Sequence, residues 1–206
     1  VKLGIDTLLE KHLNILEGKK LGVIINQTSV NAAMEPSLDK LLENAKVTAI
    51  FTPEHGLNGS AYAYEKINSA VSSDNIPIHS LHGKHRRPSK EMLKGIDILI
   101  FDIQDIGSRS YTYINTLFYA MEEAAKHKIQ FLVLDRPNPI GGNIVDGPML
   151  DESLRSFLGY INVPYCHGMT IGELAQYYNE EYEIGCQLTI IPMQGWKRSM
   201  KIGRAH

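Results

Sequence analysis

The segment DILIFDIQDIGSRSYTY, residues 97–113, combines an apolar strand, a polar turn and the start of a helix. Residues 98–103 are apolar apart from Asp102, a pattern typical of a strand that is covered on both faces in a parallel sheet. Helical spacing starts at Tyr111, so the polar turn lies at the carboxyl end of the strand. Ligands bind at that edge in open α/β sheets. The segment therefore predicts a central strand and one wall of a binding site.

The rest of the chain repeats this alternation of strand and helix. Apolar runs predict further strands at residues 20–25, 47–51, 76–79, 129–134 and 188–193. Capping residues and helical spacing predict helices that begin at Asp6 or Thr7, at Pro36 and Ser37, at Ser89 and at Thr170. Such alternation predicts an α/β fold, a doubly wound and mostly parallel sheet with helices on both faces.

Four of the predicted strands end in polar clusters. The clusters are residues 26–29, 52–55, 104–109 and 135–138. Parallel strands share one direction, so the four clusters should meet at one edge of the sheet. The pattern favours a small-molecule site there.

Composition excludes several classes of protein. The chain has 206 residues and a net charge of -2, which gives no basic field for nucleic acid. No apolar run approaches the roughly 20 residues of a membrane-spanning helix, and two cysteines are too few for a disulfide scaffold. The sequence indicates no oligomeric state.

Nucleotide and metal motifs are missing from the sequence. Neither G-x-G-x-x-G nor the P-loop pattern occurs, and no G-x-S-x-G elbow marks a serine nucleophile. His79, His82 and His85 are evenly spaced, but Gly83 and Pro88 favour a basic loop over a metal-binding helix. We expect no cofactor and no metal. A phosphate-dependent enzyme stays open as an alternative, and it would place an anion near Ser108 or Ser110.

Carboxylates at the strand ends indicate glycoside hydrolysis, which commonly uses two carboxyl groups across a sugar bond. Glu54, Asp102, Asp105 and Asp135 are the candidates. Structural roles are equally open for two of them: Asp135 could form a buried ion pair with Arg136, and Asp102 could accept hydrogen bonds from the backbone amides of a neighbouring loop. Another alternative is a non-catalytic sugar-binding module on the same fold.

Several longer strings resemble the exo-β-N-acetylmuramidase (NamZ-like) glycoside hydrolases, a bacterial family formerly catalogued as a domain of unknown function. The strings are TPEHG (52–56), FDIQDIGSR (101–109), YTY (111–113), DRPNP (135–139), GG (141–142), GP (147–148), CHGMTIGELA (166–175) and GW (195–196). The resemblance implies a Rossmann-like catalytic domain. It also implies release of N-acetylmuramic acid from the non-reducing end of peptidoglycan fragments, so the expected partners are peptidoglycan-derived muramyl sugars.

Within this resemblance, Glu54 is the expected general acid, and Asp105 or Asp102 the second catalytic group. Other polar residues are expected to bind substrate: His55, Asn26, Gln104, Arg109, Tyr111, Asp135, Arg136, Asn138 and His167.

The resemblance also sets expectations for domains and location. Residues 1–196 are expected to form the catalytic domain, with 143–196 as the possible start of a lid or second domain. Residues 197–206 would be a tail, without the C-terminal domain of the family. Action on peptidoglycan implies a secreted or periplasmic protein, although no signal is present in this chain and the sequence leaves a cytoplasmic location open.

Overall fold

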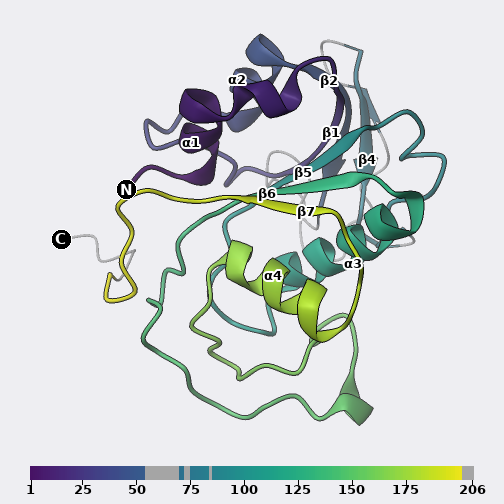
Figure 1. Ribbon diagram of the computed structural model, residues 1–206. Helices are drawn as coiled ribbons and strands as arrows, with labels where there is room; N and C mark the ends of the chain where they lie inside the picture. Colours follow the sequence, from purple (N-terminus) through teal and green to yellow (C-terminus); the bar gives the residue numbers. More distant parts are fainter. Residues whose placement is uncertain (54–69, 72–74, 84, 201–206) are drawn as a thin grey trace.

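The computed structural model describes residues 1–53, 70–71, 75–83 and 85–200. These residues form a seven-stranded sheet in the order β3-β4-β2-β1-β5-β6-β7 (Figure 1). All neighbouring strands are parallel except β3 and β4. The predicted doubly wound, mostly parallel α/β sheet is confirmed.

The strands are β1 (Lys20–Ile25), β2 (Lys46–Thr52), β3 (Ala70–Val71), β4 (Pro77–Ser80), β5 (Ile98–Asp102), β6 (Gln130–Leu134) and β7 (Leu188–Ile191). The α-helices of the described residues are α1 (Gly4–Lys11), α2 (Ser37–Asn44), α3 (Thr112–His127) and α4 (Ile171–Glu181). Two short 3₁₀ helices are η1 (Leu13–Leu16) and η2 (Glu152–Leu154).

Helices cover both faces of the sheet, α1 and α2 on one and α3 and α4 on the other (Figure 1). Successive strand residues point to opposite faces, so β5 sends Leu99 and Phe101 to the α3 side and Ile98 and Ile100 to the α1 side. All five β5 residues are buried. This explains why the strand is apolar at consecutive positions and not at alternate ones.

The order of the strands reverses between β1 and β5. From β1 the chain adds β2 and β4 on one side, and from β5 it adds β6 and β7 on the other. Ile25 and Asp102 are paired at the carboxyl ends of the two strands. In such sheets a ligand crevice lies outside the carboxyl ends at the point of reversal, so this topology places the candidate site next to the 97–113 segment.

Two local predictions were wrong, and one short strand was not predicted. The first helix begins at Gly4, earlier than predicted, because the Asp6 carboxylate in its first turn accepts a hydrogen bond from the Leu3 amide (2.8 Å). Residues 89–94 form turns and not a helix, since Pro88 and Gly95, with φ +79°, leave too few residues between them. The two-residue strand β3 was not predicted, because so short a strand has no period to detect.

The first and last described segments are joined. The backbone N–H of Lys2 donates to the Gln194 carbonyl and the N–H of Gln194 donates to the Lys2 carbonyl, both at 2.9 Å. Residues 197–200, part of the expected tail, pack on the body: the Gly142 N–H donates to the Arg198 carbonyl (2.7 Å). A Cβ atom at Gly142 would lie 2.8 Å from Arg198 Cγ and 3.0 Å from the Trp196 ring, so a side chain at this position would displace residues 196–198.

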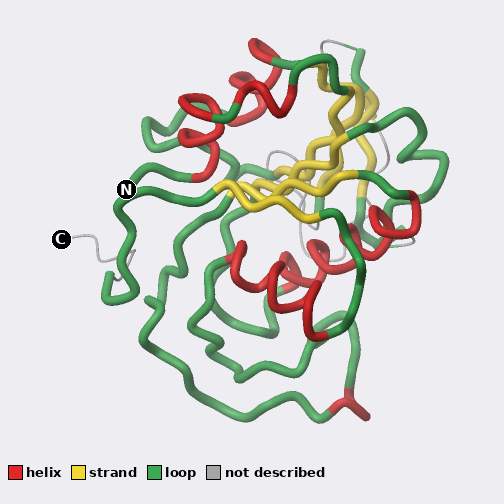
Figure 2. Tube along the Cα trace, in the orientation of Figure 1, coloured by secondary structure: helices red, strands yellow, loops and turns green. Residues whose placement is uncertain are grey.

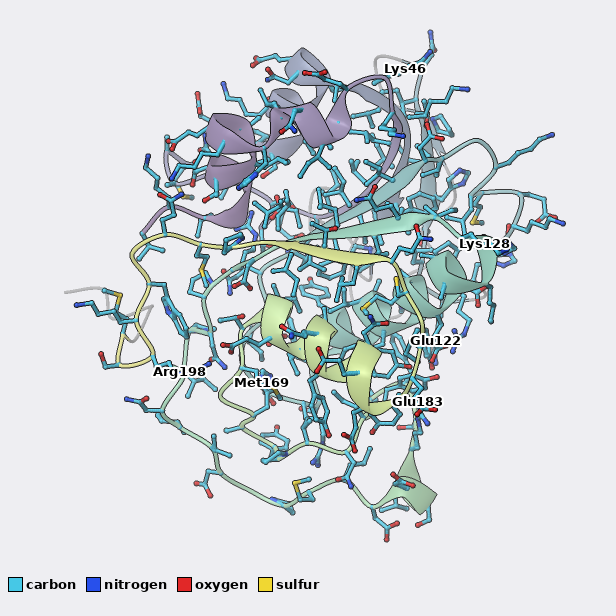
Figure 3. The ribbon with its side chains drawn as sticks, in the orientation of Figure 1. Lys46, Glu122, Lys128, Met169, Glu183 and Arg198 are labelled. Atoms are coloured by element: carbon cyan, nitrogen blue, oxygen red, sulfur yellow. The ribbon has the colours of Figure 1, made fainter. Side chains whose placement is uncertain are left out.

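A long connection runs from β6 to α4 and contains little regular structure (Figure 2). It is held against α3 and α4 by a cluster around Glu122, whose carboxylate accepts hydrogen bonds from Tyr160 (2.8 Å), Tyr178 and Arg87. Burial opposes ionisation of Glu122, but the hydrogen bonds from Tyr178, Arg87 and Tyr160 outweigh it and lower the pKa of the carboxyl group. In Figure 3, Glu122 lies away from Met169, which marks the beginning of α4. The cluster therefore anchors the connection far from the carboxyl edge.

Candidate active site at the carboxyl edge of the sheet

The ends of β1 and β5 are tied together by hydroxyl groups. Ser29 Oγ donates to the Asp102 carbonyl, and the Gln104 N–H donates to Thr28 Oγ1 (3.0 Å). Asn26 is 4% exposed, and its Oδ1 accepts from the Thr28 N–H (2.9 Å). Its Nδ2 has no hydrogen-bond partner among the described residues. Asn26 therefore shapes the turn after β1 and keeps an amide donor unused.

Asp102 and Arg136 form a buried ion pair across the end of the sheet. Arg136 Nε donates to Asp102 Oδ1 (2.6 Å), and the two side chains are 3% and 0% exposed. Arg136 Nη2 also donates to the Val30 carbonyl (2.8 Å), so one guanidinium group joins the ends of β1, β5 and β6. Asp102 thus has a structural partner, but that partner is the Arg136 guanidinium and not the loop backbone amides of the alternative given above. This geometry places Arg136 in the scaffold and not in the open cleft.

Asp135 turns away from Arg136 and caps α4. Its carboxylate accepts from the Gly172 N–H (2.8 Å), from Thr170 Oγ1 (3.1 Å) and from the Arg136 backbone N–H (3.0 Å). Burial raises the pKa of Asp135 to about 6, although these hydrogen bonds oppose the increase. The alternative of an Asp135–Arg136 side-chain pair was wrong, because the guanidinium of Arg136 reaches Asp102 instead.

Thr170 and Glu173 complete the start of α4. Thr170 Oγ1 accepts from the Glu173 N–H (3.2 Å), and the Glu173 carboxylate accepts from the Thr170 N–H (3.0 Å). The sequence predicts this reciprocal capping box, and the prediction is confirmed.

Asp105 and Gln104 occupy the tight turn after β5. The Gly107 N–H donates to Asp105 Oδ2 (2.7 Å), and Gln104 Nε2 donates to the Asp105 and Pro137 carbonyls (2.7 and 2.8 Å). Gly107 has φ +83°, and a Cβ atom there would lie 2.3 Å from Asn138 Oδ1. A glycine is thus required for the turn to approach Asn138.

His167 and Asn138 lie behind this turn. His167 is 3% exposed, and its Nε2 lies 3.5 Å from Asp105 Oδ2. Asn138 Nδ2 donates to the Met169 carbonyl (3.0 Å) and its Oδ1 accepts from the Ile140 N–H (3.0 Å). Both side chains connect the strand ends to the segment that leads into α4.

Arg109 and Tyr111 border the same edge. Arg109 Nη1 donates to the Pro148 and Val163 carbonyls (2.7 and 2.5 Å), so this guanidinium holds the long connection in place. Tyr111 is half-buried and packs edge-on against Tyr113, with ring centroids 4.8 Å apart.

Tyr165 is a residue at this edge that the sequence reasoning missed. It is 43% exposed, and its hydroxyl accepts a hydrogen bond from Ser110 Oγ (3.0 Å). Ser108 and Ser110 are themselves 3.3 Å apart, Oγ to Oγ. Tyr165 directly precedes the string CHGMTIGELA (166–175), and this position is the one sequence signal that could have indicated it.

The expected site residues therefore fall into three groups, one of which is the pair Arg109 and Tyr111 described above. The structure brings together Asn26, Asp102, Gln104, Asp105, Asp135, Arg136, Asn138 and His167 at the ends of β1, β5 and β6. Glu54 and His55 lie outside the described residues; β2, which parallels β1, ends just before them. No group of three or more potential metal ligands occurs among the described residues.

Comparison with known proteins identifies the family. The model of the N-terminal part of the exo-β-N-acetylmuramidase NamZ matches residues 21–205. The chain belongs to this family. It is 49% identical over 203 residues to the peptidoglycan β-N-acetylmuramidase NamZ of Bacillus subtilis (strain 168), a match that covers 97% of this chain and 49% of that protein. This NamZ-family chain thus spans about half the length of that relative.

Two crystal structures of DUF1343 family proteins from Bacteroides fragilis NCTC 9343 share the fold. One is 44% identical with a TM-score of 0.89, and the other is 36% identical with a TM-score of 0.83. Each match covers 97% of this chain, and 52% and 53% of the respective proteins. The Rossmann-like fold of this NamZ-family chain is therefore shared with proteins about twice its length.

Proposed function

We propose that this chain is the catalytic, Rossmann-like part of a glycoside hydrolase that releases N-acetylmuramic acid from the non-reducing end of peptidoglycan fragments. Family membership supports the substrate class. The observation that carries the proposal is a buried carboxylate, Asp105, at the carboxyl edge: it is 5% exposed, and its Oδ1 accepts no hydrogen bond from any described residue.

Two carboxyl groups have separate roles in this proposal. Glu54, which follows Pro53 directly in the sequence, donates a proton to the glycosidic oxygen as the bond to the leaving sugar breaks. Asp105 stabilises the positive charge that develops on the muramyl ring or activates the attacking water. Asp105 suits this role better than Asp102, because Asp102 is 0% exposed and already paired with Arg136.

Residues near the cleft supply sugar contacts. Asn26 keeps an unused amide donor, and Tyr165 presents an exposed ring beside the turn after β5. Hydroxyl groups of a sugar bind to such amide groups, and the apolar face of a sugar ring packs on aromatic rings. A second, C-terminal domain in the complete protein would supply the remaining wall of the cleft.

The test replaces Glu54 by Gln in the complete protein that contains this chain. Release of N-acetylmuramic acid from a β-linked N-acetylmuramyl-N-acetylglucosamine disaccharide should fall by about 10²- to 10⁴-fold, the usual effect of losing a general acid. The matched control is Glu43→Gln, on the surface of α2, which should keep normal turnover. Near wild-type turnover of the Glu54→Gln protein would contradict the assignment.

The same assay separates the enzyme from a sugar-binding module. If the wild-type protein binds the disaccharide but leaves it intact and releases no free N-acetylmuramic acid, the chain is part of a sugar-binding module and the proposed hydrolase activity is wrong.

The proposed substrate also sets a location. Peptidoglycan lies outside the cytoplasmic membrane, so we infer a secreted or periplasmic protein. Fractionation of the source cells tests this inference, and recovery only with the cytoplasm would contradict it. Among the described residues, no helix is long and apolar enough to span a membrane.

A further inference from the structure

The buried His167 ring lies next to Asp105, and a hydrogen bond from the Met169 backbone fixes the tautomer of this ring. The Met169 N–H donates to His167 Nδ1 (3.2 Å), so Nδ1 acts as an acceptor and carries no proton. A neutral ring must then hold its proton on Nε2. Nε2 lies 3.5 Å from Asp105 Oδ2 and makes no hydrogen bond to any described residue.

The two oxygens of Asp105 have different surroundings. Oδ2 accepts from the Gly107 N–H (2.7 Å) and lies next to His167 Nε2, whereas Oδ1 is buried and accepts from no described residue. A buried polar atom without a partner costs free energy, which a donor on the substrate would offset. The protein therefore holds Oδ2 by a hydrogen bond and leaves Oδ1 without one.

We infer that His167 is a positioning residue: it fixes Asp105 through Oδ2 so that Oδ1 points to the substrate. His167 was expected to bind substrate, but its side chain is 0% exposed and lies behind the carboxylate. The 3.5 Å contact is long for a hydrogen bond, and contacts of this kind commonly tighten when the substrate binds. The inference rests on the proposed catalytic role of Asp105.

The residues around the pair hold the backbone of Asp105 in place. Its carbonyl accepts from Gln104 Nε2, and the turn at Gly107 is packed against Asn138. One hydrogen bond, from the Gly107 N–H to Oδ2, does not by itself prevent rotation of the carboxylate group. His167 lies next to the same oxygen and can oppose this rotation.

Two substitutions separate this role from a purely structural one. His167→Asn keeps an oxygen near the Nδ1 position to accept from the Met169 N–H but has no donor that reaches Asp105. His167→Gln extends an amide donor to the position of Nε2. Both variants are made in the complete protein, and thermal unfolding shows whether each is folded.

The kinetic result expected is a difference between the two variants. His167→Asn should lower kcat by about 10²-fold, as for a misplaced catalytic group, with KM nearly unchanged. His167→Gln should recover most of kcat. Equal kcat in both variants, or an increase of KM at unchanged kcat, would overturn the inference.

A measurement on the wild-type protein tests the geometry without enzyme activity. The ring ¹⁵N chemical shifts of His167, recorded after labelling of the histidines, should report protonation at Nε2 and an unprotonated Nδ1. A proton on Nδ1 would overturn the inference even if the hydrolase is confirmed. Conversely, failure of the Glu54→Gln test would reject the proposed function and leave this tautomer in place.

Discussion

At the scale of single residues, the side chains at the ends of β5 and β6 have different roles because they have different hydrogen-bond partners, even where the residue type is the same. Asp102, Asp105 and Asp135 are all buried aspartates at one edge of the sheet. Asp102 is neutralised by a guanidinium group, Asp135 caps a helix, and Asp105 keeps one oxygen unused. Asp102 Oδ2 and Asp105 Oδ1 both lack a described hydrogen-bond partner, but of the three aspartates only Asp105 is neither paired with a guanidinium group nor used as a helix cap.

Asp135 should make stability depend on pH. Its pKa is raised by burial to about 6 from 3.8, so the folded chain binds more protons than the unfolded chain between these values. The contribution of Asp135 is therefore full below about pH 4 and is lost as the pH rises through 6. Relative to Asp135→Asn, the free energy of unfolding of the wild type should fall by up to about 3 kcal/mol between pH 4 and 7.

Urea unfolding at both pH values checks this prediction. Asp151→Asn is the control. Hydrogen bonds from Ser153 lower the pKa of Asp151, so the free energy of unfolding of the wild type relative to this variant should change with pH in the opposite direction. If the difference between wild type and Asp135→Asn is the same at pH 4 and 7, Asp135 does not titrate in this way.

At the scale of elements, the connection between β6 and α4 depends on contacts with the helices that it covers. The Tyr160 ring packs edge-on against Tyr119 (centroids 4.7 Å apart) and lies 4.0 Å from the Arg155 guanidinium. Its hydroxyl joins Glu122 and Arg87. Tyr160 therefore anchors the part of the connection around it, where the 3₁₀ helix η2 is the only regular element among the described residues 143–165.

Removing one hydroxyl should loosen this connection. Tyr160→Phe keeps the ring contacts but loses the hydrogen bond to a charged carboxylate, which typically contributes about 1.5 to 3 kcal/mol. Unfolding in urea should show a loss of this size, and proteases should cut within residues 150–160 faster. Tyr177→Phe is the matched control, since its hydroxyl makes only a 3.4 Å contact with the Asn162 carbonyl. Equal losses in the two variants would count against a special role of Tyr160.

Most elements could be predicted from the sequence, because hydrophobic periodicity and capping residues act locally. β1 has the predicted bounds, and α4 begins after Thr170 as its capping box indicates. The meeting of the strand ends could also be predicted, since it follows from parallel pairing alone. The choice of partners could not: Arg136 follows Asp135 in sequence but pairs with Asp102 on the next strand. The pairing depends on the direction in which each side chain points in the folded chain, and the sequence alone does not give that direction.

At the scale of the whole molecule, the Asp102–Arg136 pair joins the two halves of the sheet. Arg136 follows β6, Asp102 ends β5, and the Val30 carbonyl follows β1, on the far side of the strand reversal. The pair is buried, so each charge depends on the other being in place.

Replacing one member of this pair should lower the free energy of unfolding strongly, and replacing both members by apolar residues should lower it less. Arg136→Met or Asp102→Leu alone should lower the free energy of unfolding by about 3 to 5 kcal/mol, because each leaves a buried charge uncompensated. The double variant should lose clearly less than the sum of the two. Urea unfolding of the four proteins measures the difference, and strictly additive losses would show that the two charges do not interact.

The mutual backbone pairing of Lys2 with Gln194 has a consequence for synthesis on the ribosome. Lys2 is made 192 residues before its partner Gln194, which corresponds to roughly 10 to 40 s of translation. Helix α1 packs on β6 and β7, which are also made late. The apolar side chains of α1 must therefore stay uncovered by these strands until β6 and β7 have also been made.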